Sequence, residues 1–348
     1  MTFTYDPEVQ KFVRDCQVKG KEVKVEEFPV AVMDEPNFVN SLRQSVVRWQ
    51  QLITVLQQTS DSAAFDSVLD EVNFYTSFLN TLNSVDKQIN SPETDLTKQL
   101  LNIKKKYHIV IGFDNDINFS AWYNNVRAIA DFMRSFPINE LLSSTQFGEI
   151  CNAIDKFTTP IEHLCRLMHY PIKKCVNLFE ALARDLKKHL LGVLKEHQIL
   201  KMDLKDFKLI FEYLKTAFTK WDLLHRSFRE HMKSQRYDRN NKLNMEIKAE
   251  LLGFKDRMHK VFEFRDQHSS LREIFSSIIS KEKQSLDKTN IGNFIKIEDI
   301  DRAYSYILQV DIFDLSPEGD AAFESAKNRY EGDIDSVEKT IINKIRER

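Results

Sequence analysis

The residues best suited to chemistry are thiols and imidazoles in the middle of the chain. They are Cys151, His163, Cys165, His169 and Cys175. Side chains of these two types bind Zn²⁺ in structural metal sites. Cys165 and His169 are four residues apart and share one face of a helix, but His163 and Cys165 point to different sides of it. Because this spacing fits no zinc module, we expect buried thiols and half-exposed imidazoles, with no metal and no cofactor.

Other patterns that could support catalysis are equally weak. The sequence contains no phosphate-binding loop, dinucleotide fingerprint, metalloprotease helix or nucleophile elbow. A metal-dependent helical-bundle enzyme would need Glu-x-x-His spacing on facing helices, whereas Glu162 directly precedes His163 and Glu230 directly precedes His231. Asp299 and Asp301 fall on polar helix positions, where a solvated face is the ordinary interpretation. The sequence therefore predicts no active site.

Basic residues gather between Arg226 and Lys242, in a polar stretch that we expect to be a helix end followed by a loop. They could bind phosphates, but acidic residues interrupt them and the chain has a formal net charge of −2. Few aromatic side chains lie among them, so a solvated face is favoured over a nucleic-acid site.

The composition favours long helices in a soluble protein. Only eight glycines and eight prolines occur in 348 residues, so helix breakers are scarce. The first residues lack the apolar core of a signal peptide, and no uninterrupted apolar segment is long enough to span a bilayer. Four widely spread cysteines fit reduced thiols. We expect a cytoplasmic protein without membrane insertion.

Apolar residues recur at spacings of three and four, which is the period of a helix with one buried face. These stripes predict helices over 37–56, 65–89, 93–107, 114–136, 172–197, 204–228, 251–278, 303–310 and 323–345, and one over 143–170 that Pro160 kinks or divides. The run 108–113 is either a short strand or a buried connection. Trp221, Phe179 and Phe264 are expected in the core.

These elements predict an all-α fold, an elongated series of consecutive antiparallel helical bundles. The predicted divisions are 1–35 (a helix and an extended arm), 36–135 (a first bundle), 136–280 (second and third bundles), 281–290 (a polar linker) and 291–348 (the start of a further bundle).

The last predicted helix carries an apolar stripe to its end. Its members are Tyr330, Ile334, Val337, Ile341 and Ile345. No later segment follows to cover this stripe, so it either packs back onto the chain or awaits further sequence. We predict it as a partner-binding surface.

Seven short motifs occur in the order found in the N-terminal tail of dynein heavy chains, and the chain resembles that family over nearly its whole length. The motif residues are Glu71, Phe74, Tyr75, Leu79, Leu82, Val85, Gln88, Ser91 and Pro92; Phe113, Asp114 and Asp116; Phe136, Pro137, Leu141, Leu142 and Ser143; Tyr170, Pro171, Glu180, Ala181, Arg184, Asp185 and Leu186; Phe218, Trp221 and Asp222; Phe264, Arg265, His268 and Leu271; and Asp314, Ser316, Gly319, Ala326, Tyr330, Ile334, Val337 and Glu338. Tyr75 and Phe323 stand where the family usually has Trp.

The resemblance implies a non-catalytic tail scaffold of a motor that moves toward microtubule minus ends. It implies binding to dynein intermediate chain, light intermediate chain, dynactin and cargo adaptors, and to a second heavy chain in the full-length protein. Residues 1–35 would end the dimerisation module, and ATP hydrolysis would belong to the full-length parent. Without the resemblance, the alternative is a helical vesicle-tethering or membrane-surface adaptor, which the bundles and the basic stretch also fit.

Overall fold

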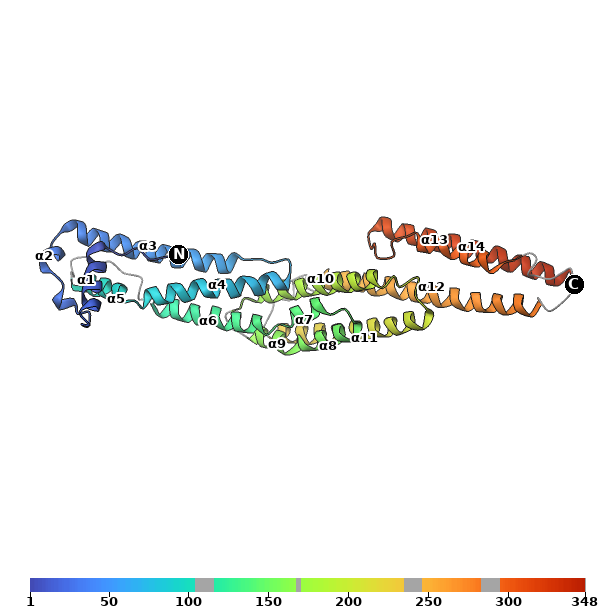
Figure 1. Ribbon diagram of the computed structural model, residues 1–348, viewed down its shortest axis with the longest axis horizontal. Coiled ribbons are helices and arrows are strands. Elements are labelled where there is room, and N and C mark those ends of the chain that lie inside the picture. Colours follow the sequence, from blue (N-terminus) through green and yellow to red (C-terminus); the bar gives the residue numbers. More distant parts are fainter. Residues whose placement is uncertain (104–115, 167–169, 235–245, 283–294, 348) are drawn as a thin grey trace. The chain divides into compact units, whose positions relative to one another are not determined.

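The computed structural model describes residues 1–103, 116–166, 170–234, 246–282 and 295–347 (Figure 1). Every regular element among them is helical, which confirms the predicted all-α class of consecutive bundles. The helices are α1 (Pro7–Val18), η1 (Val25–Glu27), α2 (Val30–Met33), α3 (Pro36–Ser62), α4 (Val68–Ile89), α5 (Pro92–Ile103), α6 (Asp116–Arg134), α7 (Ile138–Ser143), α8 (Phe147–Lys156), α9 (Thr158–Arg166), α10 (Ile172–Glu196), α11 (Leu204–Ser234), α12 (Glu246–Glu282), α13 (Ile297–Leu308) and α14 (Pro317–Arg346).

Helices α1 and α4 each begin with a side-chain cap. The Asp6 carboxylate accepts the Glu8 backbone N–H at the start of α1, at 2.9 Å. The Ser67 hydroxyl accepts the Asp70 N–H at the start of α4, at 3.1 Å. Each bond satisfies a backbone donor that has no partner within its own helix.

The chain forms two compact units. Unit 1 comprises residues 1–136 and 159–178, and unit 2 comprises 137–158 and 179–348. The five divisions anticipated from the sequence stay a prediction, and most of the expected linker at 281–290 lies outside the described residues.

Unit 1 is built around the apolar faces of α3, α4, α5 and α6. α4 packs along α6, and α1 packs against α5. Trp49 of α3 is buried, its ring stacks on Phe3, and its indole N–H donates to the Thr4 carbonyl oxygen at 3.1 Å. The N-terminal residues are thereby held on α3.

Unit 2 pairs α8 with α11, α11 with α12, and both α12 and α14 with α13. Phe179 of α10 stacks on Trp221 and Phe228 of α11, with ring centroids 4.8 Å and 4.3 Å apart. Phe179, Trp221 and Phe264 are all buried, as predicted.

Three local predictions need correction or qualification. Helix α7 was not predicted, because its six residues are too few to show a periodic stripe. Ile103 continues the apolar stripe of Leu96 and Leu100 in the helix predicted over 93–107, which implied an inward side chain, but it is 53% exposed as the last residue of α5. The break expected at Pro160 comes earlier, at Phe157, and Pro160 lies in the first turn of α9, where its missing N–H costs no bond. The run 108–113 lies outside the described residues.

Candidate partner-binding site

The thiols and imidazoles singled out in the sequence are divided between the two units, and one of them lies outside the described residues. Among the described residues, no group of three His, Cys, Asp or Glu side chains is arranged to hold a metal ion. Cys151 belongs to unit 2, whereas Cys165 and Cys175 belong to unit 1. His163 is exposed, with its ring edge-to-face against Phe132, and His169 lies outside the described residues. The predicted burial of the three thiols is confirmed.

Cys165 lies near the end of α9 and Cys175 near the start of α10, and both thiols are buried. The two thiols act on each other's pKa in opposite directions, because their interaction lowers that of Cys165 and raises that of Cys175.

A buried polar cluster joins α4 to the start of α10 in unit 1. Glu71 is 3% exposed, and its carboxylate accepts a hydrogen bond from the Tyr170 hydroxyl. Lys174 donates to the Ser60 carbonyl oxygen and, at 3.3 Å, to the Tyr75 hydroxyl. Burial raises the pKa of Glu71 to about 7, while Tyr170 and Lys174 act in the opposite direction. The sequence showed Glu71, Tyr75 and Tyr170 only as motif members and did not single out Ser60 or Lys174, because a long chain segment separates α4 from the start of α10.

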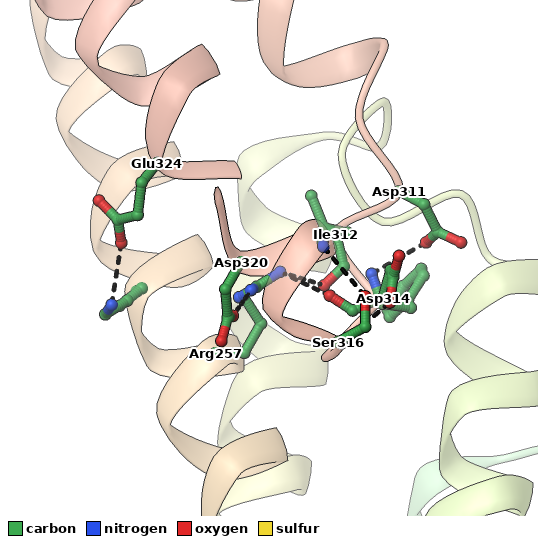
Figure 2. A network of polar contacts seen from close by, with 10 residues as sticks. Arg257, Asp311, Ile312, Asp314, Ser316, Asp320 and Glu324 are labelled. Atoms are coloured by element: carbon green, nitrogen blue, oxygen red, sulfur yellow. Dashed lines mark hydrogen bonds and ion pairs between the residues drawn. The ribbon is translucent and has the colours of Figure 1, made fainter. Parts of the chain in front are cut away.

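A second polar network holds α12 against the turn between α13 and α14 in unit 2 (Figure 2). The buried Arg257 guanidinium donates to the carbonyl oxygens of Ile312 and Asp314, at 3.3 Å and 3.2 Å. It also pairs with the Asp320 carboxylate and lies over the Phe323 ring, 4.6 Å from its centroid. The charge of Arg257 is therefore paired, and both of its terminal nitrogens have hydrogen-bond acceptors, although no sequence motif pointed to this residue.

The turn itself depends on a close approach at Gly319. The Asp314 carboxylate accepts the Ser316 N–H at 2.9 Å, and the Ser316 hydroxyl accepts the Gly319 N–H at 3.0 Å. A Cβ atom on residue 319 would overlap both the side chain and the carbonyl oxygen of Asp314. The structure thus gives a physical role to Asp314, Ser316 and Gly319, which the sequence had shown only as members of one motif.

An aromatic cluster covers the start of the stripe predicted to bind a partner. The His268 ring stacks on Tyr304 with centroids 4.0 Å apart, and its Nδ1 lies 3.2 Å from the Tyr330 hydroxyl. Phe264 meets Tyr330 edge-to-face at 4.6 Å. Burial lowers the pKa of His268 to about 4, with nearby Arg265 acting in the same direction.

The stripe on α14 is therefore largely covered by the chain itself. Tyr330, Ile334 and Ile341 are buried, and Val337 is half-buried. The side chain of Ile345 lies outside what the structure describes. Of the two alternatives, packing back onto the chain is the one observed for the three buried residues. A binding role for the five positions stays a prediction.

Other apolar side chains of unit 2 face outward, and we call them the outer apolar residues. They are Leu209, Tyr213 and Leu223 on α11, Leu252 and Ile274 on α12, Leu308 on α13 and Ile342 on α14. Ile342 directly follows buried Ile341 and is 48% exposed. Helical periodicity identifies the inner face, so these outward positions were missed.

The basic stretch is described only in part. Arg226 and Arg229 are exposed on α11, and residues 235–242 lie outside the described part of the chain. Within that part, none of the helices combines the length and the low polarity needed to cross a bilayer.

Comparison with known proteins gives one consistent match. Residues 39–348 match the family model described as "Dynein heavy chain, N-terminal region 1". The chain is 28% identical to "Dynein heavy chain, cytoplasmic" of Drosophila melanogaster, an alignment that covers 100% of this chain and 8% of that protein. The Caenorhabditis elegans protein of the same name is 27% identical, over 94% of this chain and 7% of its own length. "Dynein heavy chain-like protein 1" of Plasmodium falciparum is 27% identical, over 90% and 6%. The chain thus spans less than a tenth of the length of these relatives.

Proposed function

Because the chain belongs to the dynein heavy chain family, in its N-terminal region, we propose that it is a tail scaffold on which other dynein subunits assemble. The observation that carries this proposal is the family match over residues 39–348. The matched region is the tail and not the motor domain. In this proposal the chain binds intermediate chain and light intermediate chain, and through them or directly dynactin and cargo adaptors.

The whole protein's activity is part of the same proposal. A full-length heavy chain would pair with a second copy, hydrolyse ATP and move toward microtubule minus ends in the cytoplasm. This chain would contribute attachment points on rigid helices, which hold binding side chains more firmly than loops do.

We place the intermediate chain on α14. Its buried residues Tyr330, Ile334 and Ile341 anchor the helix from within, while Ile342 and half-buried Val337 stay accessible. Exposed apolar side chains on a rigid helix are the kind that become central anchors of an interface. The stripe predicted from the sequence would then support the binding face, with Ile342 as the contact.

The test is a pull-down of purified intermediate chain with this chain, alone and extended past Arg348, with light scattering for stoichiometry. Binding should weaken about tenfold or more in Ile342→Asp, because a charge would replace an apolar anchor. The control variant Leu209→Asp alters an outer apolar residue of α11 and should bind normally. Absence of binding by both folded lengths of chain would refute the proposal.

Exposed Arg226 and Arg229 favour one competing function, an adaptor at a vesicle surface. Basic residues near anionic lipid give attraction that salt screens within about 8 Å at physiological ionic strength. Cosedimentation with phosphatidylserine vesicles that persists at physiological salt, together with no intermediate-chain binding, would favour this function over the scaffold.

A further inference from the structure

We propose that a cavity between α11 and α12 binds an acidic peptide segment of a partner protein, with one apolar side chain of that segment inserted. The cavity has a volume of about 510 Å³, and both helices belong to unit 2. Ligand sites in proteins typically have volumes of about 300 to 1,000 Å³. Residues of α11 and α12 alone line it, so the site is separate from the surface proposed for the intermediate chain on α14 and does not rest on that proposal.

The buried lining of the cavity, which we call its floor, is apolar and largely aromatic. It consists of Phe218 and Trp221 of α11 and Leu251 of α12. The Trp221 ring stacks on Phe179, with centroids 4.8 Å apart. The Phe218 ring meets Phe254 edge-to-face, at 5.6 Å. Because neighbouring rings hold both aromatic side chains in place, the floor is formed before a ligand enters, and it suits an apolar side chain.

The exposed lining of the cavity carries more positive than negative charge. Arg226 and Arg229 of α11 and Lys255 of α12 are its cations, and Asp222 and Glu230 are its acids. Lys255 pairs with Asp222 at 3.5 Å. Within the described part of the chain, no ion pair involves Arg226 or Arg229. Two guanidinium groups are therefore available to a ligand beside the cavity, and a single acid, Glu230, opposes them.

This combination of charge and apolar surface determines the chemistry of the ligand. A guanidinium group binds a carboxylate through two parallel hydrogen bonds, and clusters of arginine recognise acidic motifs. Aspartate and glutamate are ionised at neutral pH. An apolar floor beside two unpaired guanidinium groups therefore fits a segment in which acidic residues flank one apolar residue. Arginine and aromatic side chains are also enriched in protein interfaces relative to the rest of the surface.

The shape of the site favours a peptide over a lipid surface. An anionic lipid surface would also attract Arg226 and Arg229. It would meet the protein through outward-facing side chains such as Leu252, which is 42% exposed. Trp221 is only 4% exposed, so a ligand contacts it by placing a group inside the cavity. A single side chain of a peptide can do so, and the floor would then contribute to its affinity.

Isothermal titration calorimetry of the full chain with two synthetic peptides tests the site. The first peptide is acetyl-Glu-Asp-Glu-Phe-Glu-Asp-amide, and the second has serine in place of phenylalanine. We expect saturable binding of the first peptide and binding about tenfold weaker or more for the second, because burial of an aromatic side chain is lost at equal charge. Raising the salt concentration from about 0.15 M to about 0.5 M should weaken binding of the first peptide, since salt screens the attraction between charges.

Variants locate the binding at the cavity. Arg226→Gln with Arg229→Gln should weaken binding of the phenylalanine peptide about tenfold or more, because two charge-assisted contacts are lost. Leu252→Glu should also weaken it, since a like charge would stand beside the acidic peptide. The matched control is Arg48→Gln with Arg127→Gln, which removes two exposed arginines of unit 1 and should leave the affinity within about twofold. All five positions are exposed, and circular dichroism verifies that each variant is folded.

Three results would overturn the proposal. They are no binding of the phenylalanine peptide, equal binding of the serine peptide, and an equal loss of affinity in the cavity variant and the control variant. Phosphatidylserine vesicles distinguish the lipid alternative. Vesicle binding that persists at physiological salt and is lost in Arg226→Gln with Arg229→Gln, without peptide binding, would assign the site to a lipid surface instead. The titration contains no intermediate chain, so its failure is distinct from a failure of the pull-down.

Discussion

Burial acts in opposite directions on Glu71 and His268. A carboxylate loses more by desolvation than a carboxylic acid, so the pKa of Glu71 rises to about 7. An imidazolium loses more than a neutral imidazole, so the pKa of His268 falls to about 4. Each side chain keeps a hydrogen-bond partner, Tyr170 for Glu71 and Tyr330 for His268. Glu71 is therefore buried as a carboxylic acid below about pH 7, and His268 is buried as a neutral imidazole above about pH 4.

Replacing Glu71 by glutamine should flatten the pH dependence of unit 1. The folded chain holds the proton more tightly than the unfolded chain, whose pKa is 4.5. The stability that the protonated Glu71 side chain provides is fully present below pH 4.5 and is lost as the pH rises through about 7. The loss amounts to roughly 3 kcal/mol at most. Glutamine stays neutral and can still accept from Tyr170.

The measurement is urea unfolding of the chain and of Glu71→Gln at about pH 5 and about pH 8. The free energy of unfolding of the unsubstituted chain should fall more between these conditions. Parallel profiles for the two proteins would contradict a buried, neutral Glu71.

At the scale of the element, the start of α14 shows how one turn can determine the position of a helix. Arg257 of α12 binds carbonyl oxygens of the turn and the carboxylate of Asp320 in the first turns of α14. A buried cation removed from its partners would cost several kcal/mol, so these contacts restrict the turn to one conformation. The close contact of Gly319 with Asp314 then permits the chain to enter α14 directly.

Gly319→Ala should destabilise unit 2, because the new methyl group meets Asp314 backbone and side-chain atoms. Overpacking of this kind costs about 1 to 3 kcal/mol. Gly332→Ala is the matched control on the same helix, since a Cβ there meets nothing within 4 Å. It should stabilise the protein by up to about 1 kcal/mol through helix propensity. Thermal unfolding measures both, and equal changes in the two variants would rule out the close contact.

At the scale of the whole molecule, the two units should respond differently to pH. Glu71 lies in unit 1 and His268 in unit 2. The stability that Glu71 provides is lost as the pH rises through about 7. The stability that neutral His268 provides is complete above its unfolded pKa of 6.5 and is lost as the pH falls through about 4.

Raising the pH from about 4.5 to about 7 should therefore lower the urea midpoint of unit 1 and raise that of unit 2. Tryptophan fluorescence can follow each unit, because Trp49 and Trp122 lie in unit 1 and Trp221 in unit 2. The variant Trp221→Phe reports unit 1, and Trp49→Phe with Trp122→Phe reports unit 2. Subtracting the pH profile of Glu71→Gln or of His268→Gln from that of the unsubstituted chain isolates the contribution of each side chain to stability. Contributions that change in the same direction would contradict the assignment.

The sequence by itself determined the all-α class, the approximate extent of the longer helices and several core residues. Phe179, Trp221 and Phe264 were identifiable because periodicity is a local property, set by which side chains share one face of a helix. The ordered motifs also pointed to the family. Helix α7 was missed because it is too short for any period to show.

Only the tertiary structure decided which faces meet. The bond from Tyr170 to Glu71, the contacts of Arg257 with the turn before α14, and the covering of Tyr330 by Phe264 and His268 all join residues far apart in the chain. Such contacts depend on how whole helices pack against one another. The spacing of residues along a single helix does not indicate which other helix it packs against. The same stripe of apolar residues can therefore be an open surface or a buried face, and packing alone made most of it a buried face here.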